Sequence, residues 1–145
     1  MEVYTIGFTR RSAEEFFQAL RKAGIRLLLD VRLNNTSQLA GFTKKDDLAF
    51  FLRELCGAGY RHEPSLAPTR ELLEDYSRKR ISWEEYERRF LALLEERGVA
   101  ESLERGLFEG PTVLLCSERG PERCHRRLAL EHLNRKWGGM EIVHL

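Results

Sequence analysis

Ile25-Arg-Leu-Leu-Leu-Asp-Val31 is an almost continuous apolar run with the length of a β-strand. Strands that are buried on both faces have this composition, and they occur in parallel sheets that helices cover on both sides. A second run, Thr112-Val-Leu-Leu115, has the same character. Both runs therefore predict buried strands at the centre of a parallel sheet.

Strand and helix signals alternate along the rest of the chain. Ser12 with Glu15, and Ser82 with Glu85, have the spacing of helix capping boxes. The expected strands are 3–6, 25–31, 60–63, 112–115 and 141–144, and the expected helices include 69–80, 82–97 and 99–108. This alternation predicts right-handed crossovers and one α/β domain over residues 1–145, with three α/β/α layers and a mostly parallel sheet of about five strands.

Composition and charge narrow the class of protein. Apolar residues make up 42% of the 145 residues and charged residues 32%, which indicates a globular chain and not a disordered one. The net charge of +1 provides no overall field to attract nucleic acid. No signal-peptide pattern follows Met1, no apolar run spans a bilayer, and the three cysteines are too widely spaced for a disulfide framework. We therefore expect a cytoplasmic protein with no membrane partner.

A cysteine-containing loop follows the strand at 112–115. The stretch Cys116-Ser-Glu-Arg-Gly-Pro-Glu-Arg-Cys124-His125 leads into a helix whose first turn exposes backbone N–H groups and a partial positive charge. Thiols at such a turn ionise more easily, and anions bind there. We predict a catalytic site with Cys116 as nucleophile or redox centre, His125 as its proton partner, Glu118 as a second acid or base, and Cys124 beside them. The alternative is a buried structural Cys116 and a hydrogen-bonded core His125.

Further polar residues leave the predicted strands at the same edge of the sheet, which is where parallel sheets bind ligands. The candidate ligand-binding residues at these exits are Gly7, Asp30, Arg32, Asn35 and His62, together with Arg126 from the helix after Cys124. Asp30 and Arg32 lie on the same face of their strand, so the alternative for them is a structural ion pair. The aromatic residues Trp83 and Tyr86 are predicted to belong to the core.

Cofactor and partner predictions follow from the same residues. Arg32 and Arg126 favour a small anionic partner, because guanidinium groups bind carboxylates and phosphates through paired hydrogen bonds. A metal ion held by Cys116, Cys124, His125 and His62 is a minor alternative, since their spacing fits no standard zinc pattern. No other cofactor is evident.

Four short motifs, in this order, resemble one protein family. They are Tyr4-Thr-Ile-Gly7, Leu29-Asp-Val-Arg32, Leu115-Cys-Ser-Glu118 and Cys124-His-Arg126. The family is the bacterial and archaeal domain of unknown function 488, and the resemblance covers essentially the whole chain. It implies a compact cytoplasmic α/β domain without an established reaction. It also implies a set of site positions, which are Thr5, Gly7, Asp30, Arg32, Cys116, Glu118, Cys124, His125 and Arg126.

Two segments depart from the commoner form of that family. Leu33-Asn-Asn-Thr-Ser stands where a proline-bearing loop is expected, and Leu66-Ala-Pro-Thr69 stands where Leu-Gly-Gly is expected. These departures suggest a subgroup with altered substrate preference.

Three functions stay open at the level of sequence. The first is an enzyme, such as a cysteine-dependent transferase or hydrolase, that acts on a small or nucleotide-like anionic substrate. The second is a nucleic-acid-binding or processing module, for which Arg61, Arg70 and the run Arg78-Lys-Arg80 offer basic side chains. The third is a non-catalytic regulatory or interaction domain in which the cysteine loop is structural.

Overall fold

The computed structural model describes residues 2–35, 41–117 and 123–145. Its sheet has the strand order β3-β2-β4-β1-β5, and every described pairing is parallel. The strands are β1 (Glu2–Gly7), β2 (Leu27–Asp30), β3 (Gly59–His62), β4 (Thr112–Cys116) and β5 (Glu141–His144). The predicted α/β fold with a parallel sheet of five strands is therefore confirmed.

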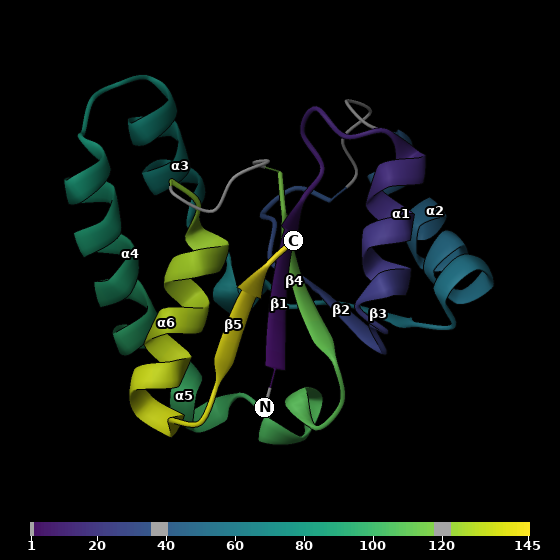
Figure 1. Ribbon diagram of the computed structural model, residues 1–145. Coiled ribbons are helices and arrows are strands. Elements are labelled where there is room, and N and C mark those ends of the chain that lie inside the picture. Colours follow the sequence, from purple (N-terminus) through teal and green to yellow (C-terminus); the bar gives the residue numbers. More distant parts are fainter. Residues whose placement is uncertain (1, 36–40, 118–122) are drawn as a thin grey trace.

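Helices cover both faces of the sheet, as Figure 1 shows. On one face lie α1 (Ala13–Lys22) and α2 (Lys45–Phe51), and on the other lie α3 (Arg70–Ser77), α4 (Trp83–Arg97), α5 (Val99–Ser102) and α6 (His125–Trp137). Shorter helical turns lie at Gly41–Thr43, Leu52–Cys56, Pro64–Leu66 and Arg105–Phe108. Of the helices that the structure describes, none has both the length and the apolarity needed to cross a membrane.

The two predicted helix starts have the expected caps. The Oγ atoms of Ser12 and Ser82 each accept a hydrogen bond, at 3.1 Å, from the backbone N–H three residues later. The prediction of one helix over 99–108 is wrong in detail. The helix ends at Ser102 because Leu103 takes an extended conformation and buries its side chain in the core, and a separate turn follows.

The sheet separates two apolar cores. On the α4–α6 side, Leu29, Leu114 and Cys116 pack with Phe90 and Leu128. On the α1–α2 side, alternate residues of the same strands pack against the two helices, namely Leu28, Val113 and Leu115 with Phe16, Phe17, Leu20 and Leu48. Successive side chains of a strand point to opposite faces, so each strand contributes to both cores. The almost continuous apolarity of β2 and β4 follows from this arrangement.

The chain changes direction around the carboxyl end of β4. After β1 and β2, which flank β4, the chain continues to helices on the α1–α2 side, whereas after β4 it continues to α6 on the opposite side. Divergent connections of this kind open a crevice at the strand ends, and ligands of parallel α/β proteins bind in such crevices. Cys116 is the last residue of β4, so the topology places it at the crevice.

Candidate functional site

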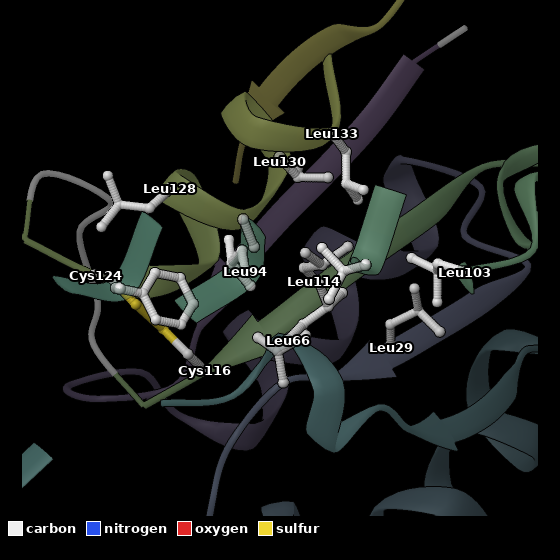
Figure 2. Close-up of a cluster of buried hydrophobic side chains, with 14 of the residues drawn as sticks. Leu29, Leu66, Leu94, Leu103, Leu114, Cys116, Cys124, Leu128, Leu130 and Leu133 are labelled. Atoms are coloured by element: carbon white, nitrogen blue, oxygen red, sulfur yellow. A yellow bond between two sulfur atoms is a disulfide. The ribbon is translucent and has the colours of Figure 1, made fainter. Parts of the chain in front are cut away.

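Cys116 and Cys124 lie side by side at the carboxyl edge of the sheet. Cys116 ends β4, and Cys124 is the N-cap residue of α6. The structure joins their sulfur atoms in a disulfide at one end of the α4–α6 core (Figure 2). Both side chains are buried. The sequence predicted Cys124 beside Cys116 but no disulfide between them, because the cysteines are widely spaced in the chain. The site thus holds two adjacent sulfur atoms.

Arg126 reaches both sulfur atoms from within the protein. Its side chain is fully buried, and Nη1 donates hydrogen bonds to Sγ of Cys116 at 3.0 Å and to Sγ of Cys124 at 3.9 Å. Arg127, the next residue, pairs with Glu131 on the outer side of α6 at 3.0 Å. The helix thus directs one of its two adjacent arginines to the cysteines and the other toward the surface.

His125 begins α6 and binds the end of β2. Its Nε2 lies 2.6 Å from the carbonyl oxygen of Val31, and its ring meets the ring of Phe90 edge-on, with centroids 5.6 Å apart. A carbonyl oxygen only accepts, so Nε2 carries the ring proton and Nδ1 is left as an acceptor. Burial lowers the pKa of His125 to about 4, so the imidazole is neutral at neutral pH. The cation beside the sulfur atoms is therefore Arg126, while the proton-partner role of His125 stays a prediction.

Acid should destabilise the fold through His125. The pKa of the imidazole is about 6.5 in the unfolded chain and about 4 in the folded protein, so the unfolded state binds more protons between these values. Stability is then fully present above about pH 6.5 and declines toward about pH 4, by up to about 3 kcal/mol. Urea unfolding from about pH 7 down to about pH 4.5 should show this loss in the wild type and a smaller one in His125→Gln.

The same comparison separates the effect of His125 on stability from that of His132, whose pKa is also lowered by burial, because both proteins contain His132. Parallel loss of stability in the wild type and in His125→Gln would contradict the assignment to His125.

Asp30 and Arg32 form a buried ion pair on the α1–α2 side of the sheet. Arg32 donates from Nε and Nη2 to the two carboxylate oxygens of Asp30, each at 2.8 Å, and its Nη2 also reaches the carbonyl of Thr43 at 2.6 Å. The hydroxyl of Tyr60 donates to the same carboxylate at 2.6 Å, and burial, together with this bond, raises the pKa of Tyr60. The structure therefore shows the ion pair that the sequence analysis kept as the alternative to a binding role.

This ion pair lies directly behind the histidine. Val31, between Asp30 and Arg32, donates its N–H to Leu115 at 3.1 Å and accepts from His125 on the opposite side of the sheet. The pair thus fixes the strand end to which His125 is bound.

The other predicted ligand-binding residues make internal contacts. Thr5 lies within β1, with Oγ1 2.6 Å from Nδ1 of His144, and Gly7 is the register partner of Cys116. Asn35 donates to Tyr60 at 3.1 Å, and Nε2 of His62 lies 2.8 Å from the carbonyl of Arg32. None of these four residues lines the pocket that the structure describes beside the cysteines. The predicted acid or base Glu118 lies outside the described residues.

A pocket with a volume of about 170 Å³ opens beside the sulfur atoms. Four of the predicted site residues line it, namely Arg32, Cys116, Cys124 and His125. Asn34, Ser117 and Arg123 add polar groups from the neighbouring loops. Among the lining residues that the structure describes, arginines are present and acidic residues are absent, so the described lining carries a net positive charge.

The opposite wall of the pocket was missed by the sequence analysis. It consists of Pro68, Leu73, Tyr76, Trp83 and Tyr86, from α3, α4 and the segment before α3. Tyr86 is buried, as predicted for a core residue, but Trp83 and Tyr76 are only partly buried. The spacing of Trp83 and Tyr86 places them on one face of α4, and a core stripe has the same spacing, so no local signal distinguishes the two roles.

The metal site that was considered as a minor alternative has no matching cluster of ligands in the part of the chain that the structure describes. There, no three side chains of His, Cys, Asp or Glu converge on a common point. His62, the fourth suggested ligand, makes its bond to the backbone of Arg32 instead. Metal binding therefore stays an untested prediction.

Comparison with known proteins places the chain in a family. No curated protein and no solved structure matches it. A family model described as "Domain of unknown function DUF488" matches residues 12–133, which is most of the chain. The matched region includes the buried ion pair at the end of β2 and the cysteine loop with Arg126. The chain therefore belongs to the DUF488 family, as its motifs predicted.

Proposed function

We propose that the protein is a cysteine-dependent enzyme that acts on a small anionic substrate, with Cys116 as its nucleophile. The observation that carries this proposal is the buried guanidinium of Arg126, 3.0 Å from Sγ of Cys116. A cation at this distance stabilises the thiolate relative to the thiol. The amino end of α6, which begins beside Cys124, adds a partial positive charge of the same sign.

The pocket supports an anionic substrate. Arg123 and Arg32 both line it. Arg32 is already bound to Asp30, whereas Arg123 is exposed and has no ion pair among the described residues. Arg123 is thus the side chain best suited to meet the charge of an incoming ligand.

The proposed reaction has two steps. The thiolate of Cys116 forms a bond to an electrophilic atom of the substrate while the bond to the leaving group breaks, and the leaving group departs with the electron pair. Water, in a hydrolase, or a second nucleophile, in a transferase, then displaces Cys116 and restores the thiolate. Where Cys116 and Cys124 are joined in the disulfide, two thiol groups of a reductant, which become a disulfide themselves, supply the two electrons and two protons that convert it to the active pair of thiols.

The test is the pKa of Cys116 in the reduced protein. We expect a value below about 7.5, compared with about 8.5 for an ordinary thiol. The thiolate absorbs in the ultraviolet, so the difference between the titrations of the wild type and Cys116→Ser reports on Cys116 alone. Cys56 is an internal reference, because burial raises the pKa of its thiol.

A matched pair of variants tests the cause. Arg126→Met is expected to return the pKa of Cys116 to the ordinary range, while Arg127→Met, which removes only the arginine that pairs with Glu131, leaves it low. A Cys116 thiol that titrates at or above about 8.5 in the wild type would contradict the proposed nucleophile, whatever the variants do.

A further inference from the structure

The aromatic wall of the pocket is a continuous stack of rings. Trp83 and Tyr86 are nearly parallel, with centroids 5.1 Å apart and an interplanar angle of 18°. Tyr86 in turn stacks on the fully buried Phe90, at 6.1 Å and 16°. Tyr76 packs against both Trp83 and Tyr86, at 5.6 Å and 5.1 Å. Because its innermost ring is held by the core, the stack holds the aromatic wall of the pocket in a fixed position.

A rigid aromatic surface favours a planar ring as its ligand. Stacking of a heterocyclic base on protein aromatic rings contributes about 1–3 kcal/mol and does not depend on the identity of the base. Asn34, Ser117 and His125 also line the pocket. Their amide, hydroxyl and imidazole groups are of the kinds that form hydrogen bonds with the polar edge of such a ring. A ring with hydrogen-bonding edges therefore suits the pocket better than a plain hydrocarbon ring.

The size of the pocket and its charges restrict the ligand further. A volume of about 170 Å³ is below the about 300–1,000 Å³ of pockets that enclose drug-sized ligands, so it has room for one ring system. A second hollow, lined by Lys79, Ser82 and Glu84, adjoins the first along Tyr76, Trp83 and Arg123. A ligand with its ring in the pocket thus has Arg123, which lines both hollows, at the mouth, where an anionic group would lie.

From these contacts we infer that the pocket binds a nucleoside monophosphate, with its base against Tyr76, Trp83 and Tyr86 and its phosphate toward Arg123. This substrate class rests on the proposed function, since it names the substrate of the same site. In this arrangement Cys116 lines the pocket that holds the base.

The chain has two tryptophans, so replacing the other one allows binding to be followed by the fluorescence of Trp83 alone. Trp137 packs against Phe108 and Arg105 and does not line the pocket, so Trp137→Phe leaves a single reporter at the site. Cys116→Ser in the same protein separates binding from thiol chemistry. We expect the common ribonucleoside monophosphates to quench the fluorescence of Trp83, and ribose 5-phosphate, which lacks a base, to bind about 10-fold more weakly or not at all.

Two variants separate the contacts, with affinity measured by calorimetry. Tyr76→Leu should weaken the binding of nucleoside monophosphates about 10-fold. Arg123→Ala, at an exposed position, should weaken their binding by a similar factor. The affinity for adenosine, which has no phosphate, should stay unchanged. Equal affinity for ribose 5-phosphate and for the nucleotides, or no binding of any nucleotide by a folded protein, would overturn the inference.

The outcomes for the two proposals are distinct. A low pKa of Cys116 without nucleotide binding overturns this inference alone and leaves the cysteine-dependent enzyme standing. Nucleotide binding with an ordinary Cys116 pKa overturns the enzyme proposal and supports the nucleotide pocket.

Discussion

Replacement of Asp30 by alanine is expected to lower the free energy of unfolding by about 3–5 kcal/mol. The carboxylate is fully buried and accepts hydrogen bonds from Arg32 and Tyr60. Without it, the guanidinium of Arg32, which is also buried, keeps its charge and loses its counterion. An uncompensated charge in the interior costs more than the ion pair contributes. Urea unfolding of the two proteins at neutral pH measures the difference.

Asp75→Ala is the matched control. Asp75 also pairs with arginines, Arg80 at 3.3 Å and Arg89 at 3.2 Å, but the side chain of Arg80 is 56% exposed. Water replaces the lost carboxylate there, so we expect a change of at most about 1 kcal/mol. If the two substitutions lower the free energy of unfolding by the same amount, the burial of the Asp30–Arg32 pair does not increase its contribution to stability.

Phe90→Ala is the second substitution with a large expected effect. The ring is fully buried in the α4–α6 core and contacts both Tyr86 of the aromatic wall and His125 of the polar wall. Loss of a buried phenylalanine ring costs about 3–5 kcal/mol, through lost burial and the cavity that remains. The free energy of unfolding should fall by this amount, and chemical denaturation followed by far-ultraviolet circular dichroism measures it.

Phe50→Ala is the control for ring size. Phe50 is 49% exposed and contacts Phe51 and Arg53 at the surface. We expect its removal to change stability by about 0.5 kcal/mol or less. An equal loss in both variants would show that Phe90 is not held by the core in the way the structure describes.

Much of the fold could be predicted from local patterns. The capping boxes at Ser12 and Ser82 set the helix starts correctly, because an N-cap bond depends only on residues three positions apart. The apolar run at 25–31 identified a central parallel strand, because only a strand covered on both faces is apolar at successive positions. The segment 99–108 was less predictable, since Leu103 leaves the helix to fill the core, and only the tertiary structure determines that.

The candidate site was predictable in part, for reasons of geometry. Parallel topology alone implied that Arg32 and Cys116 would meet at one edge, and both line the same pocket. The topology did not specify which face of the sheet each side chain occupies. The Asp30–Arg32 pair packs on the α1–α2 side and Cys116 on the other, so Asp30 supports the site from behind. The disulfide and the aromatic wall depend on loop and helix packing, for which the sequence carries no local signal.

The two walls of the pocket come from separate stretches of the chain, which has an evolutionary consequence. The sulfur atoms and Arg126 belong to β4 and α6, whereas Tyr76 and Trp83 belong to α3 and α4. The two segments that were expected to differ from the common family pattern each contain a residue that lines the pocket, Asn34 in one and Pro68 in the other. Substitutions in these segments would alter the pocket and leave Cys116 and Arg126 in place, so the substrate that we propose could change independently of the proposed thiolate.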